Sequence, residues 1–108
     1  MREIKFRAWD KENKTMYDWN TIRDYPIDYT FGSDIIIPMQ YTGLNDKNGQ
    51  ELYEGDICTD GGVTFTIGWN KFTAGFVARG EKTNVPLLYL HLDMYEKIGN
   101  IHDKEDTP

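Results

Sequence analysis

Residues 56–79 read DICTDGGVTFTIGWNKFTAGFVAR, and this stretch decides the fold class. Apolar residues alternate with polar or small ones over Val63–Ile67, the period-two pattern of a β-strand with one buried face. Residues 56–59 and 75–79 read as strands on either side, joined to it by a Gly-Gly turn and a short connection. Three strands with short turns predict a curled meander like a small SH3-type barrel.

The first residues predict an antiparallel hairpin. Over residues 3–9 apolar and polar side chains alternate, which indicates a strand with one buried face. A polar turn at 10–14 leads to a second predicted strand at Thr15–Trp19. We expect residues 20–34 to be loop, with a weak strand at Tyr29–Phe31.

The middle of the chain carries a proline and a strong turn signal. Ile35–Ile37 reads as a short buried strand that Pro38 either ends or confines to a sheet edge, and residues 39–42 are a candidate continuation. Asn48-Gly49 favours a type I′ hairpin turn, in which both central residues have positive φ.

The C-terminal third is less regular. The apolar residues of 87–95 fit one face of a strand and one face of a helix equally well. We favour a short helix, because Pro86 is a residue that suits a helix start. Lys97–Ile101 reads as a final strand. The predicted fold is mainly β, with a β-rich α+β fold as the alternative. A single domain covers 1–108, with an N-terminal hairpin subregion (1–38), a barrel-like subregion (39–102) and a polar tail (103–108).

Composition restricts the setting. The 108 residues carry 12 basic and 18 acidic side chains, a net charge of −6, which disfavours general coating of nucleic acid. A single cysteine, Cys58, excludes an intramolecular disulfide. Neither a signal peptide nor an apolar run of about 20 residues stands out, so we expect a cytoplasmic protein without a membrane partner.

The sequence offers little for catalysis. Cys58 could pair with His91 or His102, yet it lies in the apolar phase of a strand, where cysteine is usually a small hydrophobe. The segment that starts at Asp46 resembles the beginning of an EF-hand calcium loop, but Glu51 and Ile57 stand where that loop requires glycine and glutamate. We therefore predict no enzyme activity, no catalytic residue, no metal site and no cofactor.

Large aromatic residues are the candidate binding residues, with a role in the core as the alternative. They are Trp9, Trp19, Tyr41, Tyr53 and Trp69.

Three blocks of sequence resemble the YopX family of phage and prophage proteins. The first opens with Met1-Arg2-Glu3-Ile4-Lys5-Phe6-Arg7-Ala8-Trp9-Asp10, and Met16-Tyr17 follows it. The second comprises Met39-Gln40-Tyr41-Thr42-Gly43-Leu44, Asp46-Lys47-Asn48-Gly49 and Tyr53-Glu54-Gly55-Asp56-Ile57, and the third is Tyr95-Glu96-Lys97-Ile98-Gly99-Asn100-Ile101. Cys58 and Lys97 depart from the aliphatic residues usual there.

The resemblance implies a phage or prophage gene, the cytoplasm of a bacterial host and a β-rich fold, and it supplies no catalytic residue. Our first hypothesis is a non-enzymatic accessory protein that binds an unknown protein partner or itself as a homo-oligomer. The alternatives are a small nucleic-acid-binding barrel, which the negative charge makes less favoured, and an acidic inhibitor of a host defence protein.

Overall fold

Nine strands form two antiparallel sheets in a computed structural model that describes residues 4–26, 32, 34–80 and 84–103. The prediction of a mainly β fold is confirmed. The strands are β1 (Phe6–Asp10), β2 (Thr15–Tyr17), β3 (Ile36–Asn45), β4 (Glu51–Tyr53), β5 (Asp56–Thr59), β6 (Thr64–Asn70), β7 (Gly75–Arg79), β8 (Asn84–Pro86) and β9 (Glu96–Asn100). One short α-helix, α1 (Trp19–Ile22), and two 3₁₀ turns, η1 (Leu87–Tyr89) and η2 (Leu92–Met94), complete the described elements.

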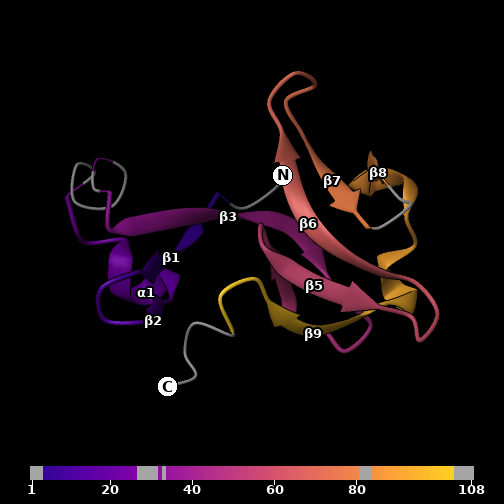
Figure 1. The fold of residues 1–108 in the computed structure, drawn as a ribbon, viewed down its shortest axis with the longest axis horizontal. Coiled ribbons are helices and arrows are strands. Elements are labelled where there is room, and N and C mark those ends of the chain that lie inside the picture. Colours follow the sequence, from indigo (N-terminus) through magenta and orange to yellow (C-terminus); the bar gives the residue numbers. More distant parts are fainter. Residues whose placement is uncertain (1–3, 27–31, 33, 81–83, 104–108) are drawn as a thin grey trace.

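Figure 1 shows two lobes that β3 connects, one with β1, β2 and α1 and the other with the curled sheet, where β4 contributes Leu52 to the core. The first sheet has the order β2-β1-β3-β4, and the second, which is curled, has the order β8-β7-β6-β5-β9. The N-terminal part of β3 pairs with β1, whereas its C-terminal part pairs with β4. The predicted boundary between the hairpin subregion (1–38) and the barrel-like subregion (39–102) therefore falls inside one continuous strand, β3.

The N-terminal hairpin is confirmed, but β1 is buried on both faces rather than on one. Ala8 packs with Ile22 and Ile36 on one side. On the other side Arg7 and Trp9 are also buried, because Arg7 reaches a carboxylate of β5 and Trp9 stacks on His102. The alternation of polar and apolar residues misled the prediction because Arg7 is a buried cation with a buried partner.

The second predicted strand is wrong at its end, because β2 stops at Tyr17 and α1 begins at Trp19. The side chain of Asp18 accepts a hydrogen bond from the Thr21 amide at 2.9 Å, which caps the helix. Part of the predicted 20–34 loop is therefore helical. The predicted weak strand at 29–31 lies outside the described residues.

Pro38 does not end the strand, but it lies where β3 has a strand partner on one side only, so the predicted edge position is correct. It sits inside the ten-residue β3, where Ala8 of β1 is its partner. Pairing of β3 with β4 begins only at Tyr41, so the other side of Pro38 needs no amide donor. The proposed continuation through residues 39–42 is correct.

The turn between β3 and β4 is not type I′, because only Gly49, with φ +81°, has positive φ there, and Asn48 does not. The Gly49 amide donates to the Asp46 carbonyl at 3.0 Å. An aspartate at the first position and a glycine at the fourth are the pattern of a type I turn followed by a bulge. The Asp46 carboxylate stabilises the turn by accepting the amides of Asn48 and Gln50.

In the curled sheet, β5, β6 and β7 occupy the predicted positions. The ambiguous segment 87–95 forms the 3₁₀ turns η1 and η2 instead of the favoured short helix or a strand. Strand β8 was not predicted. The main core of this lobe comprises Leu52, Cys58, Phe65, Ile67, Ala78, Leu87 and Leu92.

The free edge of β9 is closed by carboxylates rather than by another strand. The amide of Lys97 donates to Asp46 at 2.8 Å, and the amide of Asn100 donates to Asp103 at 2.9 Å. Both amides point away from β5, the strand that pairs with β9. No helix in the described part of the chain is long and apolar enough to cross a bilayer.

Candidate functional site

A buried ionic cluster joins the two sheets. Asp56, at the start of β5, is fully buried, and its Oδ1 accepts a hydrogen bond from Nη2 of Arg7 in β1 at 2.6 Å. Its Oδ2 accepts the Tyr53 amide at 2.7 Å and lies 3.5 Å from Nζ of Lys97 in β9. One carboxylate thus contacts groups from β1, β4 and β9.

The two cations of the cluster, Arg7 and Lys97, also donate hydrogen bonds to backbone carbonyls. Nη2 of Arg7 donates to the Glu54 carbonyl at 3.1 Å, and Nζ of Lys97 donates to the Glu51 carbonyl at 2.9 Å. Pockets of about 370 Å³ and 280 Å³ flank the cluster, and both include Arg7 and Lys97 in their walls. Because a buried charge needs its partner, these contacts fix the position of one sheet against the other.

Two of the predicted binding residues, Tyr41 and Tyr53, lie together next to this cluster. Their ring centroids are 5.3 Å apart. Lys5 lies over the Tyr41 ring and also pairs with Glu51, and Arg7 lies over the Tyr53 ring at 4.9 Å. Burial and the charge of Glu51 raise the pKa of Tyr53 to about 12. Both tyrosines are buried, where they contribute to packing.

The predicted binding residues Trp9 and Trp19 lie apart from the tyrosine pair. Trp9 is buried and stacks on His102, with ring centroids 4.8 Å apart and planes 7° from parallel. Trp19 is partly buried and packs on the cluster of Ala8, Ile22 and Ile36.

Cys58 is part of the hydrophobic core of the curled sheet. Burial and the nearby charge of Asp56 raise the pKa of its thiol to about 12. The thiol is therefore protonated at neutral pH, and a protonated, buried thiol is a poor nucleophile. In the part of the chain that the structure describes, no group of three His, Cys, Asp or Glu side chains is placed to hold a metal ion.

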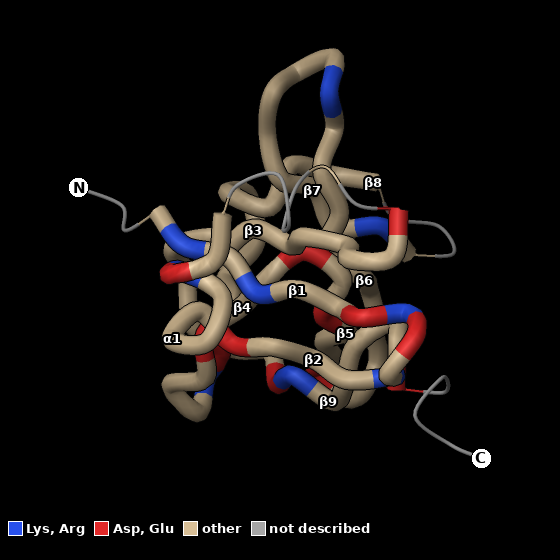
Figure 2. The backbone as a smooth tube through the Cα atoms, turned by 90° about the vertical axis from the view of Figure 1, so that its left-hand side faces the viewer, with Lys and Arg blue, Asp and Glu red and all other residues tan. Residues whose placement is uncertain are grey.

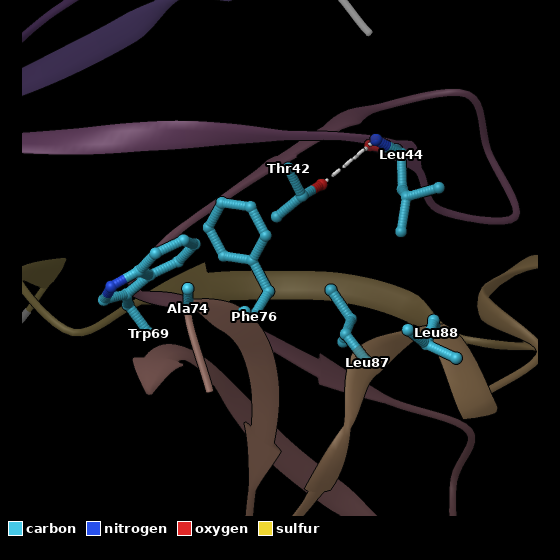
Figure 3. A pocket seen from close by; sticks show the side chains of 8 residues that line it. Thr42, Leu44, Trp69, Ala74, Phe76, Leu87 and Leu88 are labelled. Carbon is cyan, nitrogen blue, oxygen red and sulfur yellow. Dashed lines mark hydrogen bonds between the residues drawn. The ribbon is translucent and has the colours of Figure 1, made fainter. Parts of the chain in front are cut away.

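The remaining predicted residue, Trp69, lines a separate apolar groove of about 260 Å³ (Figure 3). One wall comes from the end of β3 and the other from the β6–β7 hairpin and η1. The lining residues are Thr42, Leu44, Trp69, Ala74, Gly75, Phe76, Leu87 and Leu88. Trp69 is 37% exposed and packs edge-on against Phe76 at 5.0 Å. Leu88 is 77% exposed.

The lining of the groove carries no ionisable side chain. Its one hydroxyl, on Thr42, donates to the Leu52 carbonyl at 2.8 Å and accepts the Leu44 amide at 3.1 Å. The groove therefore offers mainly apolar contact, and besides the Thr42 hydroxyl its lining contributes one further polar side-chain group, the indole N–H of Trp69.

The tip of the β6–β7 hairpin adjoins the groove. Phe72 in the turn is 88% exposed, and Nζ of Lys71 lies 5.4 Å from the centre of its ring. No acidic residue occurs between Asp60 and Glu81, although the chain has 18 acids. Figure 2 shows the projecting hairpin with a basic segment and no acidic one near its tip.

Sequence reasoning did not identify the partners of these sites. Asp56 and Lys97 both lay within blocks that resemble the YopX family, and Lys97 stood out there as an unusual residue. Leu44 lies in the second of these blocks and Leu88 in the ambiguous segment 87–95, but neither pattern indicated a groove, because an exposed leucine beside a groove looks like any leucine of a partly buried segment.

The architecture defines a class, namely small mainly β proteins built of two antiparallel sheets, one of them curled. The family model described as YopX protein matches residues 23–106. The chain belongs to the YopX family, as the resemblance of its three blocks implied.

A similar fold occurs in the crystal structure of protein EF1440 from Enterococcus faecalis. The two chains are 23% identical and superpose with a TM-score of 0.70, over 97% of each chain. No relative was found among curated protein sequences. The similarity supports the fold and carries no activity over to this chain.

Proposed function

We propose that this protein is a non-enzymatic accessory protein, of phage or prophage origin and working in the bacterial cytoplasm, that binds a protein partner through the apolar groove. The observation that carries the proposal is the groove itself, where Trp69 and Leu88 remain exposed beside a cavity of about 260 Å³. Exposed apolar side chains around a preformed pocket are typical of protein interaction sites.

The chemistry of the groove favours an apolar side chain as its occupant. Its walls have no charge, and the hydroxyl of Thr42 already makes two hydrogen bonds. An occupant would therefore gain from removal of apolar surface from water, at about 25 cal/mol per Å². A leucine, phenylalanine or tryptophan presented by another chain satisfies this requirement.

Binding of single-stranded nucleic acid is the second candidate, because Trp69 and Phe72 are exposed near Lys71. Bases stack on such aromatic rings. Against it, the chain has a net charge of −6, and the guanidinium of Arg79 already donates to the Trp69 carbonyl at 2.9 Å. The protein-binding proposal needs no phosphate contacts and is therefore preferred.

Selection from a random peptide library tests the proposal. We expect the immobilised protein to enrich peptides with a large apolar residue, and we expect Leu88→Asp to abolish their binding by placing a charge in the groove. Ile98→Asp is the matched control, because Ile98 is an exposed apolar residue on β9, outside the groove. Failure to enrich peptides, or equal loss of binding in both variants, would contradict the proposal.

A further inference from the structure

We propose that the partner in the groove is a second copy of this chain, and that Phe72 of each copy occupies the groove of the other in a two-fold dimer. This inference rests on the proposed function of the groove. It adds the identity of the partner and the residue that it inserts.

The size of the groove fits a phenylalanine side chain. An apolar cavity of about 150 Å³ is large enough to bind benzene, and this groove measures about 260 Å³. Phe72 is 88% exposed at the hairpin tip, the largest exposed fraction among the large hydrophobic residues that the structure describes. A ring in this position gains most from being covered.

The placement of tip and groove allows a closed arrangement. Trp69, Ala74, Gly75 and Phe76 line the groove and belong to the arms of the same hairpin whose tip carries Phe72. The ring to be inserted and the groove that receives it therefore lie next to each other on one copy. A two-fold axis through this region brings each tip to the other copy's groove, and such self-complementary contacts close as dimers.

The distribution of charge also favours a second copy at this surface. Two chains of net charge −6 repel each other wherever acidic surfaces meet. The stretch from Gly61 to Gly80 contains no acid, and the groove lining contains none. The hairpin and groove thus form a surface on which two copies can approach without apposing carboxylates.

The apolar surface is of the right order for a small dimer. Leu44, Trp69, Phe72 and Leu88 are each more than one third exposed, and an aromatic side chain covers about 150–250 Å² when fully buried. With the hairpin backbone, two copies of this set approach the roughly 1,200 Å² at which specific interfaces begin. We therefore expect a dimer that dissociates on dilution.

Sedimentation equilibrium and native mass spectrometry of the full chain, over a range of concentrations, test the inference. We expect a monomer–dimer equilibrium that Phe72→Ala weakens at least about 30-fold, as for a side chain at the centre of an interface. Ile98→Ala should leave the dissociation constant unchanged. Phe72 and Ile98 are both exposed, so neither variant is expected to disturb the fold.

A mixing experiment tests the reciprocal geometry. Phe72→Ala keeps an intact groove, whereas Leu88→Asp keeps an intact tip. Each variant alone should be monomeric at the concentrations used. When the two variants are mixed, with one chain isotopically labelled, they should form a heterodimer. The tip of the Leu88→Asp chain then occupies the groove of the Phe72→Ala chain, which is the one tip–groove contact that remains. Absence of the heterodimer would overturn the reciprocal arrangement.

Three results overturn the inference. The first is a monomer at every concentration, the second is a dimer that Phe72→Ala does not weaken, and the third is a Phe72 effect seen only with a single-stranded oligonucleotide. If the chain is monomeric and the groove still binds selected peptides in a Leu88-dependent way, the proposed function stands and the partner is a different protein. If peptides also fail to bind, both proposals fall.

Discussion

At the scale of single residues, Asp56 is a buried charged contact between the two sheets. Its carboxylate meets the side chains of Arg7 and Lys97 and the backbone of Tyr53. Arg7 and Lys97 come from β1 and β9, which no ladder of backbone hydrogen bonds joins. Loss of the carboxylate therefore leaves two cations without their shared counter-charge.

We expect Asp56→Asn to lower the free energy of unfolding by about 3–5 kcal/mol, the cost of removing one partner from a buried ion pair. Urea denaturation followed by fluorescence measures the loss. Asp93→Asn is the control, because Asp93 is exposed on η2, and it should stay within about 0.5 kcal/mol of the parent chain. Equal stability of the two variants would contradict the structural role of the cluster.

The thiol of Cys58 gives a second prediction. Its pKa is raised to about 12 by burial, so we expect no reaction with a disulfide reagent in the folded protein at pH 8 and rapid reaction in denaturant. The raised pKa also means that its contribution to stability is present below the ordinary value of 9.0 and is lost as pH rises from there towards about 12. Labelling of the native protein at the denatured rate would show that the thiol is accessible.

The sequence allowed only part of the residue-scale picture to be predicted. The period-two alternation identified β1 and β6 correctly, because exposed polar and buried apolar faces alternate along a strand. It misassigned Arg7, since burial of a charge depends on a partner that lies 49 positions away at Asp56. Pairing over such a distance is set by the tertiary fold and leaves no local pattern.

At the scale of elements, the turns are the most demanding parts of the chain. Gly49 and Gly55 both have positive φ, at +81° and +87°. A β-carbon at Gly49 would meet nothing within 4 Å, whereas one at Gly55 would lie 3.2 Å from Sδ of Met39 and 3.3 Å from Cγ1 of Ile101. A side chain at Gly49 would therefore cause backbone strain alone, whereas a side chain at Gly55 would cause backbone strain and steric crowding.

We expect Gly49→Ala to cost about 1–2 kcal/mol, the penalty of a left-handed conformation for a residue with a side chain. Gly55→Ala should cost a further 1–3 kcal/mol or so, because Met39 and Ile101 must move. Thermal denaturation of the two variants side by side measures the difference. Equal melting temperatures would show that crowding at Gly55 is relieved without cost.

Turn residues were easier to predict than turn types. Asn48-Gly49 correctly located the connection between β3 and β4, but Asp46 and its carboxylate determined the geometry. Likewise, the period of residues 87–95 could not separate strand from helix, and the chain adopts two 3₁₀ turns there. Short irregular segments are set by the surfaces against which they pack.

At the scale of the whole molecule, acidic side chains are unevenly distributed along the chain. The chain has a net charge of −6, while the hairpin beside the groove lacks acids. If two copies meet through the hairpin, their remaining surfaces repel each other. Salt screens this repulsion, with a Debye length of about 10 Å at 0.1 M.

We therefore expect the dimer to become tighter as sodium chloride rises from low to physiological concentration. Binding to single-stranded nucleic acid would weaken over the same range, because the release of condensed cations that drives such binding becomes less favourable as the salt concentration rises. Sedimentation equilibrium at several salt concentrations gives the sign of the slope. A dimer that loosens with salt would indicate attractive contacts between opposite charges and contradict the apolar contact.

The fold class and the family were accessible from the sequence, since both rest on strand patterns and motif blocks. The groove was not, because its walls combine residues from β3, the β6–β7 hairpin and η1. Of the five aromatic candidates, Trp69 lines the groove. Aromatic content alone does not separate core residues from surface residues, as Trp9 and Trp69 illustrate.

The carboxylate-closed edge of β9 has a consequence for crowded solutions. An open strand edge serves as a template on which further chains add and grow into fibrils. Asp46 and Asp103 occupy the outward amides of Lys97 and Asn100, so β9 offers neither of these donors to a further strand. Burial opposes ionisation of Asp46, but its three amide donors outweigh burial and lower its pKa, so the contact of Asp46 with the Lys97 amide persists into acidic conditions.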